Sequence, residues 1–224
     1  MTSSFQDAIV LFGDSLTQDK KEGAMWQLMS EAYERKLDVL NRGFGGYTTK
    51  WANPLLQRIF PSNTGSDGPK IKLITIWFDP ASPQYMPHAR LVLITPHPVV
   101  EGMRAKDTPV KLDLEHTRKY KDACLAVGKE WAVNFDNVQT LDLWKLLVEA
   151  GGGETEEALR PYYTDGVHMT PKGYRLLFDE LMRIICTRWE SLDPQKMKMS
   201  APRFDDATGK WDEDNPHRMS KGKD

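Results

Sequence analysis

Five short apolar runs alternate with longer, more polar segments along the chain, and this alternation constrains the fold more than any other feature of the sequence. The apolar residues in each run are continuous, which is typical of strands that are covered on both faces. Strands separated by segments long enough for a helix favour an α/β fold with a parallel sheet. The runs that we predict as strands cover residues 8–12, 37–41, 72–78, 90–95 and 138–142.

Three of the longer segments carry apolar residues at helical spacing, and we predict helices there. The first two cover residues 23–35 and 113–130, and the third follows Thr170. Thr170 is suited to cap that helix, and Pro171 to occupy its first turn. The apolar stripe of this helix consists of Tyr174, Leu177, Phe178, Leu181, Ile184 and Ile185. Because the helix begins so soon after His168, its start helps to fix the direction in which that histidine points.

The chain of 224 residues, 40% of them hydrophobic, has room for one domain of medium size. We predict that residues 1–190 form this domain. Residues 191–224 are rich in Lys, Asp, Pro, Met and Gly, so we expect a polar C-terminal tail with little fixed structure. The three glycines at 151–153 are interpreted as a flexible loop, because they lack the Gly-Lys-Ser/Thr ending of a phosphate-binding loop.

Charge and hydropathy exclude several classes of protein. The 30 Lys and Arg residues against 32 Asp and Glu give a formal net charge of -2, which provides no basic surface for a nucleic acid. No apolar stretch approaches the ~20 residues that span a bilayer, and the polar N-terminus does not resemble a secretory signal. We therefore expect a cytoplasmic protein without membrane insertion. Two cysteines suit neither a disulfide framework nor a metal cluster, and the oligomeric state is left open.

Two short segments, far apart in the sequence, carry the residue types of nucleophilic catalysis. The first predicted strand leads into Gly-Asp-Ser at 13–15, and a tight turn after a buried strand presents the serine hydroxyl at the rim of the sheet. The second segment is Asp-Gly-Val-His at 165–168. A neutral imidazole can take the proton of a serine, and a carboxylate three residues earlier can reach the other ring nitrogen and fix its tautomer. The two segments predict a nucleophilic Ser15, with His168 as its base and Asp165 as the partner of the histidine.

Attack on a carbonyl also needs donors for the oxyanion, each worth about 3–4 kcal/mol. The Ser15 backbone N–H is one candidate. The Gly46 N–H is another, because the segment 41–49 follows the second predicted strand and a glycine lets a substrate approach the backbone closely.

Each of these elements also has a simpler interpretation. Gly-Asp-Ser is common in turns, His168 could cap or pair at a helix start, and Gly45-Gly46 could be only a tight turn. Their joint order along the chain favours a hydrolase over these readings. Among the other histidines, His97 lies between two prolines and is expected to be a loop residue. The rest are expected to be solvated: His88, His116 and His217.

Three blocks of the sequence resemble the signature blocks of the GDSL/SGNH hydrolases, at residues 12–17, 41–47 and 165–170. The resemblance is closest to the isoamyl acetate-hydrolysing esterases, includes Leu-Ile-Thr-Pro-His-Pro-Val at 93–99, and covers most of residues 9–189. It implies a flavodoxin-like three-layer α/β/α fold with a parallel sheet. It also implies Ser15 as nucleophile, His168 as base, Asp165 as its partner and Gly46 as the second oxyanion donor. The implied substrate is a small carboxylic ester cleaved through an acyl-enzyme, with no metal or other cofactor.

The family's third block, a Gly-x-Asn-Asp motif after the third strand, is missing from this chain. Residues 74–78 run directly into Asp-Pro-Ala-Ser-Pro at 79–83, so the asparagine that serves as the third oxyanion donor is absent. Only 11 residues separate Phe78 from Arg90, and three of them are prolines, which disfavours a crossover helix. We therefore expect the fold to lack one helix after the third strand, and Trp77 or Phe78 to be exposed.

Two explanations of the missing block stay open at the level of sequence. The sequence could come from an incomplete gene model or a variant transcript that lacks an internal segment. Alternatively, the chain is a shortened, catalytically inactive relative that binds without turnover. Loss of one oxyanion donor lowers a rate by about 10²–10³-fold, so weak residual hydrolysis is compatible with the sequence.

Overall fold

The computed structural model of the chain describes residues 6–59, 69–78, 89–105 and 112–200. Five parallel strands form one sheet in the order β2-β1-β3-β4-β5. The strands are β1 (Ala8–Gly13), β2 (Asp38–Gly43), β3 (Ile71–Trp77), β4 (Arg90–Ile94) and β5 (Val138–Leu141). All five coincide with the predicted runs to within two residues at either end, so the prediction of a parallel sheet is confirmed.

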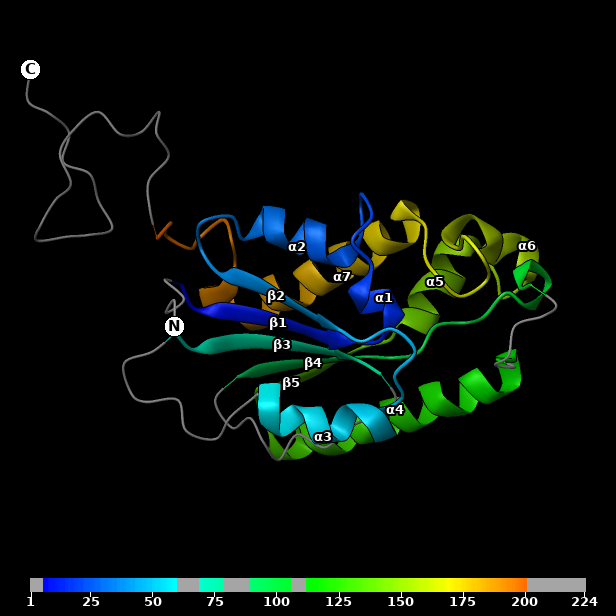
Figure 1. Ribbon diagram of the computed structural model, residues 1–224, viewed down its shortest axis with the longest axis horizontal. Helices are drawn as coiled ribbons and strands as arrows, with labels where there is room; N and C mark the ends of the chain where they lie inside the picture. Colours follow the sequence, from blue (N-terminus) through cyan, green and yellow to red (C-terminus); the bar gives the residue numbers. More distant parts are fainter. Residues whose placement is uncertain (1–5, 60–68, 79–88, 106–111, 201–224) are drawn as a thin grey trace, which may run out of the picture.

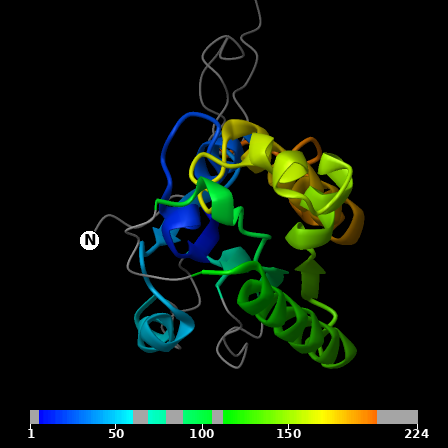
Figure 2. The same cartoon turned by 90° about the vertical axis from the view of Figure 1, so that its right-hand side faces the viewer.

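Helices cover both faces of the sheet (Figures 1 and 2), which confirms the predicted three-layer α/β/α fold. One face carries α2 (Met25–Ala32), α5 (Leu143–Gly151) and α7 (Pro171–Arg188), and the other carries α3 (Thr49–Ile59) and α4 (Leu114–Asn134). The remaining short elements are α1 (Ser15–Gln18), α6 (Glu156–Leu159), η1 (Glu101–Met103), η2 (Arg160–Tyr162) and η3 (Glu190–Leu192).

Strand β1 shows why the apolar runs are continuous rather than alternating. All six of its residues are buried. Ile9 and Leu11 point into the core shared with α2 and α7, whereas Val10 and Phe12 point into the core shared with α3 and α4. A strand with a core on each side therefore carries apolar side chains at consecutive positions.

The order of the strands places a topological switch point at the end of β1. The chain runs from β1 to β2 on one side of it, and then returns to β3 on the other side. In open α/β sheets, ligands bind at the carboxyl ends of the strands where the strand order reverses in this way. Gly13, the last residue of β1, is paired with Gly43 of β2 and Trp77 of β3. Ser15 follows two residues later, and so lies at this switch point.

The predicted helix after His168 is confirmed as α7. The Thr170 hydroxyl accepts a hydrogen bond from the Gly173 N–H at 3.3 Å, and Pro171 is the first residue of the helix. Five of the six residues in the predicted apolar stripe are buried, and Phe178 packs against the core from the edge. The helix therefore starts at a fixed place, three residues after His168.

Two of the longer helices were not predicted. Helix α3 contains Pro54, and α5 is capped by the Asp142 carboxylate, which accepts a hydrogen bond from the Lys145 N–H at 3.0 Å. The glycine run interpreted as a flexible loop is the C-terminal cap of α5. Gly152 has φ +78°, and the Gly152 and Gly153 N–H groups bond to the last carbonyls of the helix.

The expected exposure of Trp77 or Phe78 is wrong. Both are buried: Phe78 packs against Phe12 with ring centroids 4.8 Å apart, and Trp77 packs against Tyr174 and His97. Neighbouring aromatic rings therefore cover both side chains. Strands β3 and β4 pair directly, but the connection at 79–88 lies outside the described residues, so the predicted absence of a helix there stays a prediction.

The beginning of the predicted tail packs onto the domain. Leu192 is buried, its carbonyl accepts a hydrogen bond from the Tyr33 hydroxyl at 2.7 Å, and the Ser200 N–H donates to the Arg35 carbonyl. The rest of the predicted tail, residues 201–224, lies outside the described residues. Within the part of the chain that is described, no helix combines the length and apolarity needed to cross a membrane.

Candidate active site

Ser15 occupies the first position of α1, immediately after the end of β1. The Asp14 carboxylate caps this short helix by accepting a hydrogen bond from the Leu16 N–H at 2.9 Å. Burial raises the pKa of Asp14. The strand, the cap and the helix start therefore hold the serine hydroxyl at the carboxyl edge of the sheet, as the sequence predicted.

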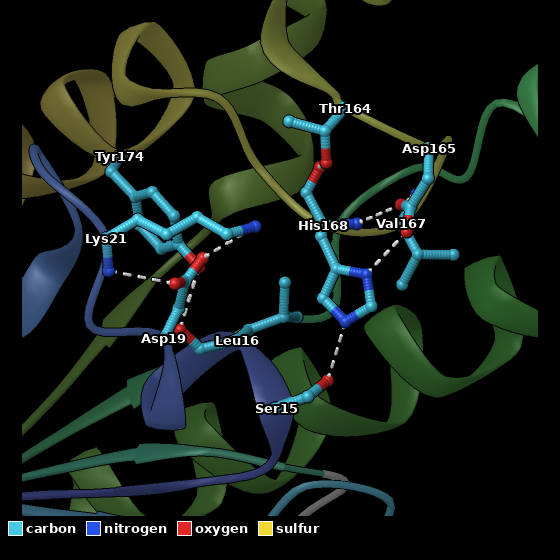
Figure 3. Close-up of polar contacts among 9 residues, drawn as sticks. All are labelled: Ser15, Leu16, Asp19, Lys21, Thr164, Asp165, Val167, His168 and Tyr174. Carbon is cyan, nitrogen blue, oxygen red and sulfur yellow. Dashed lines mark hydrogen bonds and ion pairs between the residues drawn. The ribbon is translucent and has the colours of Figure 1, made fainter.

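The structure brings Ser15, His168 and Asp165 into one hydrogen-bonded chain (Figure 3). The Ser15 hydroxyl lies 3.0 Å from Nε2 of His168, across 153 residues of sequence. Nδ1 of His168 lies 2.7 Å from Oδ2 of Asp165. A histidine with its Nδ1–H donated to a carboxylate keeps Nε2 free to accept a proton, which is the arrangement that activates a serine.

Asp165 is held as a carboxylate by the backbone of its own loop. Its Oδ1 accepts hydrogen bonds from the N–H groups of Val167 at 3.0 Å and His168 at 2.7 Å. Partial burial opposes ionisation, but the hydrogen bonds from the His168 ring and from these two N–H groups outweigh it, so the pKa of Asp165 is lowered. The negative charge that orients the imidazole is therefore present at neutral pH.

The loop between η2 and α7 is closed on itself and tied to the rest of the domain. Tyr163 and Met169 form an antiparallel bridge, and the Thr164 N–H donates to the His168 carbonyl at 2.8 Å. Gly166 has φ +85°, and its carbonyl accepts a hydrogen bond from the Val100 N–H at 3.0 Å. A side chain at Gly166 would collide with the Val100 carbonyl, so a glycine is required there.

A second Asp-x-x-His segment shows which part of the geometry is specific. At the start of α4, Oδ1 of Asp113 accepts from the His116 N–H at 2.7 Å, and Oδ2 lies 2.6 Å from Nδ1 of His116. These contacts match those of Asp165 and His168, yet His116 is exposed, as predicted, and no serine among the described residues hydrogen-bonds to it. The local pairing is therefore a helix-start motif, and the contact with Ser15 is what sets His168 apart.

The glycine segment after β2 lies beside the serine. The Phe44 N–H donates to the Gly13 carbonyl at 2.8 Å, and the Gly45 N–H donates to Oε1 of Gln18 at 2.6 Å. A Cβ atom on Gly45 would lie 3.8 Å from Cβ of Ser15. Gly46 has φ +78°.

Two N–H groups at this place are available to a ligand. Among the described residues, neither the Ser15 N–H nor the Gly46 N–H has a hydrogen-bond partner. A Cβ atom on Gly46 would meet no atom within 4 Å, so the space around it is open. These are the two groups that the sequence suggested as oxyanion donors.

Comparison with known proteins shows the family to which the chain belongs. A GDSL esterase/lipase of Arabidopsis thaliana is 31% identical over 243 aligned residues, covering 90% of this chain and 94% of the relative. The isoamyl acetate-hydrolyzing esterase 1 homolog of Bos taurus is also 31% identical, covering 82% of this chain and 83% of the relative. The chain belongs to the GDSL esterase/lipase family. No family model matches the chain.

Solved structures show the same GDSL fold. A lipase/acylhydrolase from Enterococcus faecalis superposes with a TM-score of 0.60 at 19% identity, covering 82% of this chain and 97% of that protein. An aryl esterase from M. smegmatis superposes with a TM-score of 0.56 at 13% identity, covering 81% and 99%. The SGNH-type fold expected from the resemblance is therefore confirmed.

The burial of His97, a residue near the Ser15 site, was not predicted from the sequence. His97, expected to be an ordinary loop residue, is only 4% exposed, and its Nδ1 lies 3.0 Å from the Pro98 carbonyl and 3.2 Å from the Tyr163 hydroxyl. Its ring packs against those of Trp77 and Tyr163. Burial lowers the pKa of His97 to about 4, so it is neutral at pH 7. The signal that could have found it is its position just after β4, at the ligand-binding edge of the sheet.

Tyr174 connects α7, which begins just after His168, to the segment that carries Ser15 (Figure 3). Its buried hydroxyl donates to the Leu16 carbonyl at 2.9 Å and lies 3.3 Å from Oδ2 of Asp19. Leu16 directly follows Ser15, and Asp19 is the residue at which α1 ends. The contact therefore fixes the distance between α7, which starts beside His168, and the helix that carries Ser15.

We predict that Tyr174→Phe lowers the free energy of unfolding by about 1–3 kcal/mol, because the Leu16 carbonyl loses its buried donor. Ester hydrolysis should fall as well, since Ser15 and His168 are then less firmly aligned. Urea unfolding and steady-state kinetics measure the two effects. Tyr120→Phe on α4 is the matched control, because the Tyr120 side chain is exposed, and it should change neither quantity. Equal behaviour of the two variants would contradict the prediction.

The described residues contain no group of three or more His, Cys, Asp or Glu side chains placed to hold a metal ion. A surface hollow of about 410 Å³ lies at the start of α4, lined by Glu101, Asp113, Leu114, Glu115 and Arg118. None of these residues belongs to the hydrogen-bonded chain around Ser15. The candidate active site of this GDSL family member is therefore the Ser15 site.

Proposed function

We propose that the protein is a serine hydrolase that cleaves small carboxylic esters through an acyl-enzyme formed on Ser15. The observation that carries the proposal is the 3.0 Å contact between the Ser15 hydroxyl and Nε2 of His168, with Nδ1 of the same ring on Asp165. This contact joins two segments that are far apart in the sequence. Within the described residues it has no counterpart at His116, where the same local pairing with an aspartate occurs.

The proposed reaction has two halves that use the same groups. Nε2 of His168 takes the Ser15 proton as Oγ attacks the ester carbonyl, and the Ser15 and Gly46 N–H groups donate to the oxyanion. The protonated imidazole then gives its proton to the alkoxy oxygen, and the alcohol leaves. In the second half a water molecule, deprotonated by His168, attacks the acyl-enzyme and releases the acid with Ser15 restored.

The proposed substrate class follows from the relatives. Those of Bos taurus and Saccharomyces cerevisiae are named for the hydrolysis of isoamyl acetate, an ester of a short acid and a short branched alcohol. We propose a small-molecule carboxylic ester as the substrate of the present chain.

We further propose that the chain works with an incomplete oxyanion site. The Gly-x-Asn-Asp block is absent after β3, and loss of one donor costs about 10²–10³-fold in rate. The alignment with the Arabidopsis relative spans 243 positions against 224 residues in this chain, so that relative carries positions that are absent here, which supports an internal deletion. The alternative is an inactive relative that binds esters without turnover, and the missing block is the observation that favours it.

Labelling with a fluorophosphonate probe tests the proposal without a choice of substrate. We expect covalent labelling of the folded protein at Ser15, located by mass spectrometry of the digested product. Ser30→Ala is the control variant, because the Ser30 hydroxyl donates to the Trp26 carbonyl within a helix and should not affect the label. A folded protein that takes up no label at Ser15 would reject the hydrolase and favour the inactive relative.

A further inference from the structure

Three aromatic side chains form a row that runs from the core beside β1 to the surface. The ring centroids of Phe12 and Phe44 lie 6.2 Å apart, those of Phe44 and Tyr47 5.5 Å, and those of Tyr47 and Trp51 5.9 Å. Exposure rises outward, with Tyr47 37% and Trp51 60% exposed. Single exposed apolar residues are ordinary, whereas contiguous exposed apolar residues mark a binding surface. Phe44, Tyr47 and Trp51 are called the aromatic row below.

The aromatic row is continuous with the Ser15 site. Gly45 and Gly46 lie between Phe44 and Tyr47 in the chain, so the free Gly46 N–H is part of the same turn. That turn is closed by the hydrogen bond from the Tyr47 N–H to the Phe44 carbonyl at 3.0 Å. A ligand whose carbonyl oxygen reaches the Gly46 N–H therefore starts at the inner end of the row.

The two sides of an ester bound at Ser15 face different surfaces. The alkoxy oxygen has to face Nε2 of His168, because that nitrogen protonates the leaving group. The loop that carries His168 packs through Tyr163 and Met169 into the core that lies on the α7 face of the sheet. Phe44, in contrast, packs against the core that lies on the α3 face. The acyl group, directed away from His168, is the part of the ester that meets the aromatic row.

We infer that Phe44, Tyr47 and Trp51 bind the acyl chain of the substrate and set the acyl length that the enzyme accepts. This inference rests on the proposed function and assigns the acyl side of the same site. The exposed faces of Tyr47 and Trp51 give an apolar surface with no charged group in the row itself. Each methylene that moves from water onto such a surface is worth up to about a fourfold gain in affinity.

A series of p-nitrophenyl esters, from acetate to octanoate, measures the effect of acyl length. In the unmodified protein we expect kcat/KM to rise with acyl length. In Trp51→Ala and Tyr47→Ala the ratio of kcat/KM for octanoate to that for acetate should fall by about tenfold, which corresponds to about two methylenes losing most of their contact. Phe135→Ala is the matched control, because this aromatic side chain is 48% exposed at the end of α4, and it should leave the ratio unchanged.

A second series, acetate esters of alcohols of increasing length, separates the acyl side from the alcohol side. The inference requires the alcohol preference to be the same in the row variants and in the control. If Trp51→Ala changes the alcohol preference and leaves the acyl preference intact, the row binds the alcohol and the inference is overturned. An unchanged preference in both series overturns it too.

Binding to Ser15→Ala tests the aromatic row without any turnover. Octanoate should bind this variant more tightly than butanoate in calorimetric titrations, and adding Trp51→Ala should remove the difference. If Ser15→Ala shows this binding but the unmodified protein takes up no fluorophosphonate, the hydrolase is refuted and the acyl-binding surface stands. Labelling at Ser15 with equal binding of the two acids would refute the acyl surface and leave the hydrolase.

Discussion

Substitution of His168 by alanine is expected to lower kcat for ester hydrolysis by about 10⁴-fold or more, because it removes the only group within hydrogen-bonding distance that the described residues offer as a base for Ser15. The Ser15 hydroxyl then keeps its proton at neutral pH and attacks an ester slowly. Affinity for the substrate should change little, since the imidazole acts on the proton rather than on the acyl group. Steady-state kinetics with a p-nitrophenyl ester and the rate of fluorophosphonate labelling measure the loss.

The chain supplies a matched control for this substitution. His116 makes the same contacts with Asp113 that His168 makes with Asp165, and both follow an aspartate by three residues next to a helix start. His116→Ala removes the same number of atoms and the same type of local Asp–His pair, but it leaves the contact between Ser15 and His168 in place. We expect full activity in that variant. Comparable losses in both variants would mean that activity depends on the helix starts and not on a base at Ser15.

The sheet could be predicted from sequence because its strands are buried on both faces and therefore read as continuous apolar runs. Helix α3 was not predicted; Pro54 lies in its middle, where a proline ordinarily disfavours a helix, yet the fold accommodates it. Helix α5 was missed because its glycine cap was interpreted as a loop. Here the signals were present in the sequence, with Asp142 at one end and Gly152 at the other, and the interpretation was at fault.

The candidate site was predictable to the extent that local sequence determines it. Asp165 and His168 align through contacts within one loop, and Ser15 is placed by the strand that precedes it. His97 and the aromatic row were not predictable in this way. The burial of His97 depends on Trp77 and Tyr163, which are distant in the sequence. The side chains of Phe44, Tyr47 and Trp51 form a row only once the turn and the start of α3 are folded.

Asp165→Asn should lower kcat by about 10³–10⁴-fold while leaving the fold intact, because it reverses the tautomer of His168. The carboxylate uses Oδ1 for the Val167 and His168 N–H groups and Oδ2 for the imidazole. In the variant the amide oxygen stays on the two N–H groups, and the amide NH₂ faces Nδ1. Nδ1 must then accept a hydrogen bond, so the ring proton moves to Nε2 and faces the Ser15 hydroxyl. A base that already carries its proton cannot take another from the serine.

Two measurements distinguish this effect from a loss of structure. Asp113→Asn, the matched change at the other Asp-x-x-His segment, should keep full activity, since asparagine also caps a helix well. The second measurement is the stability of Asp165→Asn as a function of pH. The pKa of Asp165 lies below its ordinary value of 3.8, so the carboxylate stabilises the folded protein above that pH, and the contribution disappears as the pH falls through the lower, folded-state value. The variant should therefore be less stable than the original protein at neutral pH and equal to it in strong acid. A kcat loss that disappeared at neutral pH, or a stability difference that grew in acid, would mean that Asp165 is not the charged partner of His168.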